Sequence, residues 1–120
     1  MPSNSILSSK YREKFGNEIS FIRNCAKLGN IKISDHCHEQ ISKRKIRLKD
    51  VFESIENGAV IEVRNLERDI KILFQDSVNI PPTFFVVVAV KPPIEGICVT
   101  AYLPDKNIWV LDSNNQWRRK

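Results

Sequence analysis

The sequence predicts an α+β fold in which N-terminal helices pack on one four-stranded antiparallel β-sheet. Apolar residues recur at three- and four-residue steps through the first half of the chain, which is typical of amphipathic helices. Four strand-like segments follow in unbroken succession, and their short connections favour antiparallel pairing because parallel pairs need long crossovers. With 120 residues the chain is expected to form one compact domain. Residues 1–30 would be a helical extension, and residues 31–120 the helix-plus-sheet part.

The first helix is predicted over residues 5–28. Its apolar stripe consists of Leu7, Tyr11, Phe15, Ile19, Ile22 and Ala26. Gly16 and Asn17 can divide the segment into two helices, with Asn17 capping the second. Gly29 and Asn30 are expected to end it, since either residue accepts the left-handed backbone conformation.

Two further helices are predicted before the strands begin. One has an N-cap at Ser34 or Asp35 and runs to Arg44 or Lys45. The other ends at Gly58 and shows helical spacing of its apolar residues Leu48, Val51, Phe52 and Ile55.

The four strands are predicted at residues 59–64, 69–75, 83–91 and 96–103. The run Phe84–Val90 has no polar alternate, so its strand is expected in the sheet interior, covered on both faces. Successive side chains of the last strand are expected to point to opposite faces of the sheet. The core face would carry Ile97, Val99, Ala101 and Leu103, and the other face Cys98, Thr100 and Tyr102.

Composition narrows the class of protein. The longest apolar run, residues 84–90, is far too short to span a bilayer. The N-terminal residues show no basic segment followed by an apolar one, so no secretion signal is expected. Three cysteines form an odd count that fits free thiols in a reducing compartment. We therefore expect a cytoplasmic protein without membrane contact.

The positive charge of the chain is concentrated in two places. Nineteen Lys and Arg residues against fourteen Asp and Glu give a net charge of +5. Five cations fall within Lys43–Lys49, and two arginines and a lysine close the chain at residues 118–120. Such clustering favours a polyanionic partner, either nucleic acid or an acidic protein segment. A solvated helix end explains the first cluster equally well.

His36, Cys37 and His38 could be metal ligands, catalytic groups or surface residues. On a helix, residues two apart point about 200° away from each other, so the two histidines cannot share an ion. In an extended segment they would share a face, but Cys37 would point away. No metal and no cofactor are therefore expected. Cys37 on a helix is expected to be a small buried hydrophobe.

A polar stripe on the same helix suggests chemistry of another kind. His36, Gln40 and Arg44 follow one another at four-residue steps. A histidine in the first helical turn is normally a capping or packing residue. If the helix lies near the polar face of the last strand, however, His36, Arg44, Thr100 and Tyr102 would surround one concavity. Such groups suit metal-independent phosphodiester chemistry. For Thr100 and Tyr102, simple strand propensity is the alternative explanation.

Residues 31–111 resemble the bacterial domain-of-unknown-function family 4258. Members begin a helix with Ser-x-His and have arginines at the next positions of the same helix face. A short amphipathic helix that ends in Gly follows. They close on a strand with Thr-x-Tyr and a nearby Pro and Trp. The layout is similar to a superfamily that joins RelE-type toxins, barnase and colicin-type ribonucleases, in which helices precede a four-stranded antiparallel sheet.

The resemblance implies a metal-independent endoribonuclease, the toxin of a toxin–antitoxin or conflict system, leaving 2′,3′-cyclic phosphate and 5′-OH ends. His36 matches the motif histidine, Arg44 the second arginine, and Thr100 and Tyr102 the polar pair on the last strand. Gln40 stands where the family usually has its first arginine, and an amide cannot replace a cation at a phosphate.

These matches imply a role for each residue. His36 would be general base or acid, and Arg44 would stabilise the phosphate charge. Tyr102 would be the second proton-transfer group or a stacking surface, with Thr100 as a hydrogen-bond donor. The RNA backbone would be bound by Lys43, Lys45, Arg47, Lys49, Arg118 and Arg119.

The expected partners are RNA and an acidic antitoxin protein. The alternative is a non-catalytic RNA- or protein-binding module of the same fold, which the Gln40 departure favours. A third possibility is a structural interaction domain that dimerises through its N-terminal helices.

Overall fold

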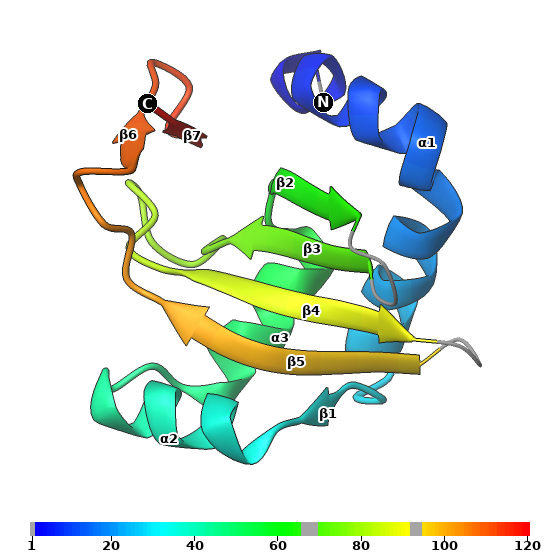
Figure 1. The fold of residues 1–120 in the computed structure, drawn as a ribbon, viewed down its shortest axis with the longest axis vertical. Helices are drawn as coiled ribbons and strands as arrows, with labels where there is room; N and C mark the ends of the chain where they lie inside the picture. Colours follow the sequence, from blue (N-terminus) through cyan, green and yellow to red (C-terminus); the bar gives the residue numbers. More distant parts are fainter. Residues whose placement is uncertain (1, 66–69, 92–94) are drawn as a thin grey trace.

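The computed structural model describes residues 2–65, 70–91 and 95–120 and shows a mixed α+β fold (Figure 1). The helices are α1 (Pro2–Lys27), α2 (Asp35–Lys43) and α3 (Leu48–Asn57). The strands are β1 (Lys32–Ile33), β2 (Val60–Asn65), β3 (Ile70–Gln75), β4 (Phe85–Lys91), β5 (Glu95–Tyr102), β6 (Trp109–Leu111) and β7 (Trp117–Arg119). None of the helices in the described ranges has the length and apolar composition that a bilayer span requires.

The main sheet differs from the predicted one in its strand count and its pairing. It has five strands in the order β1-β5-β4-β3-β2, and β6 and β7 form a separate two-stranded sheet. The pairs among β2, β3, β4 and β5 are antiparallel, but β1 pairs with β5 in parallel, Lys32 opposite Ile97 and Ile33 opposite Cys98. The prediction of a four-stranded, wholly antiparallel sheet is therefore wrong. Residues 34–94 lie between β1 and β5 and provide the long connection that parallel pairing needs.

Strand β4 occupies the interior of the sheet, as the apolar run predicted. It lies between β5 and β3, and every residue of Phe84–Val90 is buried. Val86 and Val88 belong to the core under the helices, whereas Phe85 and Val87 belong to a second core on the opposite face. The predicted start of the preceding strand, at residue 69, lies outside the described residues.

All three helices contribute to the larger core on one face of the sheet, and Figure 1 shows α3 lying behind the strands. Ile22 and Ala26 come from α1, Cys37 from α2, and Val51 and Ile55 from α3. Cys37 is fully buried, which confirms its prediction as a core residue. The extension at residues 1–30 therefore shares its core with the sheet.

Helix α1 ends and bends close to the predicted positions. Gly29 adopts a left-handed φ of 74°, and the amide of Asn30 donates to the carbonyl of Cys25 at 2.8 Å, which closes the helix. Phe15 has non-helical angles (φ −127°, ψ 22°), so α1 is kinked one residue before the predicted division. Two stripe residues have side chains outside the described part of the chain: Leu7 and Tyr11.

Helix α2 is bounded by clear capping contacts. The Ser34 hydroxyl accepts a 3.0 Å hydrogen bond from the Cys37 amide, so Ser34 is the N-cap. At the other end, the Ile46 amide donates to the Ile41 carbonyl at 2.9 Å, and Lys45 takes a left-handed φ of 56°. Lysine in this conformation carries a steric cost that glycine does not.

The β6–β7 hairpin covers part of the sheet face that the helices leave open, and the sequence did not predict it. Trp109 packs there with Phe85 and Leu73. Gln75, at the end of β3, fastens the hairpin, donating to the Asn115 carbonyl at 2.8 Å and accepting from the Trp117 amide at 3.0 Å.

Two register shifts determine which side chains reach this hairpin face. In β2 the shift lies between Val60 and Glu62, so Ile61 is an extra residue and both Ile61 and Glu62 reach the hairpin side. In β5 one extra residue separates the partners of Val87 and Val88.

The shift in β5 breaks the predicted alternation of residues 97–103. Thr100 pairs with Val87 and Tyr102 with Phe85, so both lie on the hairpin face, opposite to the buried Ala101. Ile97 pairs with Ala89 and therefore lies on the same face of the sheet as Thr100, opposite to Ala101. The extra residue between them shifts the alternation of side chains along β5 by one position. The predicted face of Ile97 is therefore wrong. Two side chains named in that prediction lie outside the described ones: Cys98 and Val99.

Candidate functional site

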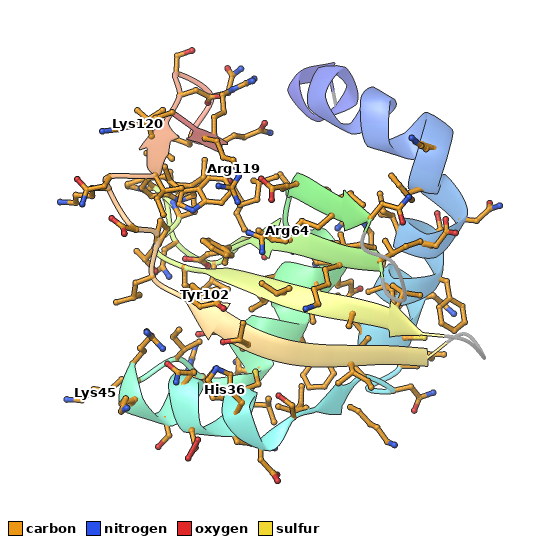
Figure 2. The ribbon with its side chains drawn as sticks, viewed as in Figure 1. His36, Lys45, Arg64, Tyr102, Arg119 and Lys120 are labelled. Carbon is orange, nitrogen blue, oxygen red and sulfur yellow. The ribbon has the colours of Figure 1, made fainter. Side chains whose placement is uncertain are left out.

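Helix α2 packs against β5 and carries His36 on its exposed side. The buried Cys37 and Ile41 fix the rotation of the helix, because both insert into the core. His36 precedes Cys37 and lies in the first turn, where it is accessible to solvent. Figure 2 shows His36 on α2 beside β5, and Tyr102 at the C-terminal end of that strand. The structure thus places the predicted histidine and the predicted phenol on two elements in direct contact.

Thr100 and Tyr102, the predicted polar pair of β5, differ in their exposure to solvent. Thr100 is buried, with 4% of its surface exposed, beside Val87. Tyr102 is 41% exposed, and its ring lies 5.3 Å from the Phe85 ring at a tilt of 46°. The phenol is therefore accessible to a ligand, whereas the threonine hydroxyl lies beneath the surface.

Arg44 has an unsatisfied donor at the C-terminus of α2. The residue is half-buried, and its Nη1 atom is buried with no hydrogen-bond partner among the described residues. A buried donor without a partner costs about 1–3 kcal/mol of folding free energy. Gln40, on the preceding turn, is also half-buried, and its carbonyl accepts from the Arg44 amide at 3.0 Å.

The basic run is divided between the end of α2 and the start of α3. Lys43 closes α2, Lys45 occupies the left-handed position, and Lys49 lies in the first turn of α3; all three are exposed. Arg47 is exposed and forms an ion pair with Asp50 at 3.1 Å. The run is therefore a solvated turn with cations in several directions, and Figure 2 shows Lys45 pointing outward from the end of α2.

A cavity of about 270 Å³ lies between the end of β5 and the β6–β7 hairpin. It is lined by Arg64, Phe85, Tyr102, Leu103, Asp105, Ile108, Trp109 and Arg119, and we call it the Tyr102 pocket. Two predicted residues come together here, Tyr102 and Arg119. The lining includes neither His36 nor Arg44.

Glu62 holds the two arginines of the Tyr102 pocket. Its carboxylate accepts from Nε of Arg64 at 2.7 Å, and from Nε and Nη2 of Arg119, the latter at 3.2 Å. The Arg119 guanidinium also lies over the Trp109 ring, 4.9 Å from its centroid. Burial alone would raise the pKa of Glu62, but the hydrogen bonds from Arg119 and Arg64 hold that pKa below its ordinary value. The same contact with Glu62 raises the pKa of Arg119.

The sequence prediction missed Arg64, Trp109 and Asp105 as members of this pocket. Glu62 and Arg64 are two apart in a strand, which places them on one face and offered a local signal. No local signal linked Glu62 to Arg119, which lies 57 residues further along the chain.

Arg118, predicted to bind RNA, faces away from the pocket. It forms an ion pair with Asp112 at the start of the hairpin turn. Burial alone would raise the pKa of Asp112, but hydrogen bonds from Arg118 and from the Gln116 and Asn114 amides lower it. Arg118 therefore stabilises the hairpin, and its neighbour Arg119 reaches the cavity.

A second cavity, of about 260 Å³, has a structural explanation. It lies beside Asp76, which is 2% exposed and accepts hydrogen bonds from the amides of Val78, Asn79 and Thr83 within its own loop. The carboxylate is thus occupied by the loop that it organises. Within the ranges that the structure describes, no group of three or more His, Cys, Asp or Glu residues converges as a metal site would require.

Comparison with known proteins gives one result. A family model described as "Domain of unknown function (DUF4258)" matches residues 33–111. No curated protein and no solved structure matches the chain. The matched range runs from the end of β1 through α2, α3 and the main sheet to β6. It contains Arg64 and Tyr102 of the Tyr102 pocket, whereas Arg119 and all of α1 lie outside it.

Proposed function

The chain belongs to the DUF4258 family, and from this premise we propose that it is a metal-independent endoribonuclease. One observation carries the proposal: the helix that bears His36 is capped at its C-terminus by Arg44, whose buried Nη1 lacks a partner in the described structure. That helix packs on β5, which bears Thr100 and the exposed Tyr102. An imidazole, a guanidinium, a hydroxyl and a phenol therefore come from two elements in contact, and these groups suit phosphodiester cleavage.

In the proposed reaction the ribose 2′-oxygen attacks the adjacent phosphorus, and the bond from phosphorus to the 5′-oxygen breaks. His36 takes the proton from the 2′-OH, and the Tyr102 phenol gives a proton to the departing 5′-oxygen. The products are a 2′,3′-cyclic phosphate and a 5′-OH. Negative charge develops on the phosphate oxygens in the transition state, and Arg44 donates to those oxygens. Thr100 lies beneath the surface, so it would support β5 near Tyr102 and would not touch the phosphate.

The arrangement of the elements supports a toxin of the RelE- and barnase-like kind. Helices precede the antiparallel strands β2 to β5, as they do in that superfamily. The net charge of +5 suits both RNA and an acidic antitoxin protein. We accordingly propose a cytoplasmic toxin whose exposed cations are covered by the antitoxin in the inactive complex.

The test is cleavage of RNA by the purified protein in the presence of EDTA. We expect 2′,3′-cyclic phosphate ends, and a rate that falls about 10²–10⁴-fold in His36→Ala, the usual contribution of a positioned acid or base. His38→Ala is the matched control, because His38 is exposed on the same helix two residues away, and its rate should stay at the wild-type level. DNA should resist cleavage because it lacks the 2′-OH. A requirement for Mg²⁺, or full activity in His36→Ala, would reject this mechanism.

A second candidate function is RNA binding without cleavage. It is favoured because the Tyr102 pocket contains Arg64 and Arg119 but neither His36 nor Arg44. Gln40 also favours this second function, because it stands where the family pattern has an arginine and so one cation of that pattern is missing. Tight binding of an RNA that stays intact over hours, in protein with native circular dichroism, would favour this second function.

A further inference from the structure

The Tyr102 pocket combines two fixed cations with an accessible aromatic ring. Glu62 holds Arg64 and Arg119, and Tyr102 presents its ring beside them. We propose that this pocket binds one nucleotide of a single-stranded RNA, with the phosphate on Arg64 and Arg119 and the base stacked on Tyr102. The proposal rests on the proposed function in naming RNA as the polymer, and it shares Tyr102 with the proposed reaction. It adds a binding subsite whose cations are separate from Arg44.

The two arginines keep donors available after their contact with Glu62. The carboxylate takes Nε of both residues and Nη2 of Arg119. Nη1 of Arg119 and both terminal nitrogens of Arg64 donate to no other protein group in the described part of the chain. The stack on Trp109 fixes the plane of the Arg119 guanidinium. Cations that are already oriented lose little conformational entropy when a phosphate binds.

The size and the aromatic surface of the pocket suit one unstacked nucleotide. Its volume of about 270 Å³ lies just below the range of about 300–1,000 Å³ that is usual for small-molecule sites. The Tyr102 ring rests against Phe85 and is 41% exposed, so part of its surface is free to accept a base. Single-stranded RNA is recognised by stacking of this kind, whereas bases within a duplex are not accessible to it.

Asp105 offers a variant that is expected to strengthen RNA binding, whereas the other variants are expected to weaken it. Its side chain accepts from the Asn107 amide at 2.9 Å, and its carbonyl accepts from the Trp109 amide at 2.8 Å, so it organises the turn that leads into β6. Asp105 also lines the pocket, where its negative charge repels a phosphate. Asp105→Asn keeps an acceptor for the turn and removes the charge. It should therefore tighten binding.

The experiment measures binding of a fluorescein-labelled 2′-O-methyl RNA of about ten nucleotides by anisotropy across a salt series. This strand cannot be cleaved, because its 2′-oxygen is blocked. Arg64→Gln should weaken binding roughly tenfold at low salt and reduce the salt slope by about 0.7, as expected when one phosphate is no longer neutralised. Tyr102→Ala should weaken binding by about tenfold with an unchanged slope, and Tyr102→Phe should retain most of the affinity. Asp105→Asn should tighten binding by roughly two- to fivefold.

Lys27→Gln is the charge-matched control, because Lys27 is exposed at the end of α1 and lines no part of this pocket. Thermal melts would establish that each variant is folded. The subsite is wrong if Arg64→Gln binds like Lys27→Gln, or if Asp105→Asn weakens binding. This binding experiment can fail or succeed independently of the cleavage test of the proposed function. Pocket-dependent binding without RNA cleavage would reject only the nuclease, and cleavage with pocket-independent binding would reject only the subsite.

Discussion

The Arg23 guanidinium on α1 donates a 2.9 Å hydrogen bond to the carbonyl of Glu56 near the end of α3. A second bond reaches the Ile55 carbonyl at 3.3 Å, and the guanidinium lies 5.2 Å from the centroid of the Phe74 ring. Burial lowers the pKa of Arg23 from its ordinary value, as expected for a cation removed from water. The contact joins a helix outside the family match to one inside it, so α1 caps the last turn of α3.

Arg23→Ala should therefore destabilise the whole domain. Both carbonyls at the end of α3 lose a charged donor, and we expect the free energy of unfolding in urea to fall by about 3 kcal/mol. Arg23→Lys should give an intermediate loss, because an ammonium keeps the charge but lacks the planar group that lies against the Phe74 ring. A loss below about 0.5 kcal/mol for Arg23→Ala would show that α1 is not anchored through this contact.

Glu62 should make stability depend on pH in the acid range. Since its folded-state pKa lies below the unfolded value, its contribution is fully present above the unfolded pKa of about 4.5 and is lost as pH falls through the folded value. Glu62→Gln should thus be less stable than wild type at pH 7, and the difference should shrink below about pH 4.5. Thermal melts of both proteins between about pH 3 and 7 would measure this. A difference that stays constant would contradict the ion-pair assignment.

Lys43 and Lys45 should attract RNA through their positive charge alone. Arg44 should act through the planar arrangement of its guanidinium donors around a phosphate. Replacing both lysines with Gln should weaken RNA binding modestly and reduce the salt slope by about 0.7 for each phosphate that is no longer neutralised, with little change in single-turnover cleavage. Arg44→Lys should preserve most of the affinity but slow cleavage, because an ammonium cannot reproduce the planar two-point hold on phosphate. If Arg44→Lys behaves like the lysine variants, Arg44 is one more surface cation and RNA binding without cleavage is the better function.

The left-handed backbone at Lys45 predicts a stabilising substitution. Glycine adopts a φ of 56° without steric cost, so Lys45→Gly should raise the free energy of unfolding by about 1 kcal/mol. Lys43→Gly provides the contrast, because residue 43 is helical, and there we expect a loss of about 1 kcal/mol. Urea unfolding of the two variants should give opposite signs, and equal signs would refute the assigned turn geometry.

Local patterns predicted the elements whose causes are local. Ser34 can cap the helix that follows it, and Gly29 follows the apolar stripe of the first helix, so both ends of the first connection could be assigned from neighbouring residues. The interior position of β4 followed from its lack of polar alternates. The roles of His36, Arg44, Thr100 and Tyr102 in catalysis stay predictions, although the structure brings α2 and β5 into contact.

The remaining features depend on partners far apart in the sequence. Strand β1 has two residues, too few for a periodic pattern, and forms only because β5 lies beside it. The sequence of residues 117–120 indicates only a basic segment, yet Trp117–Arg119 pairs with β6 and brings Arg119 to Glu62. Register shifts have no periodic signal either, so the face of Ile97 could not be predicted before its partners were known.

The register shift in β2 also affects how this protein meets copies of itself. Strand β2 forms one edge of the main sheet, and a sheet edge offers unpaired backbone groups to which another chain can add. The extra residue Ile61 interrupts that edge, and the charged Glu62 and Arg64 follow it within a strand of six residues. A bulged, charged and short edge is a poor template for a neighbouring strand. The distortion that brings Glu62 to its arginines thus also discourages sheet-to-sheet aggregation.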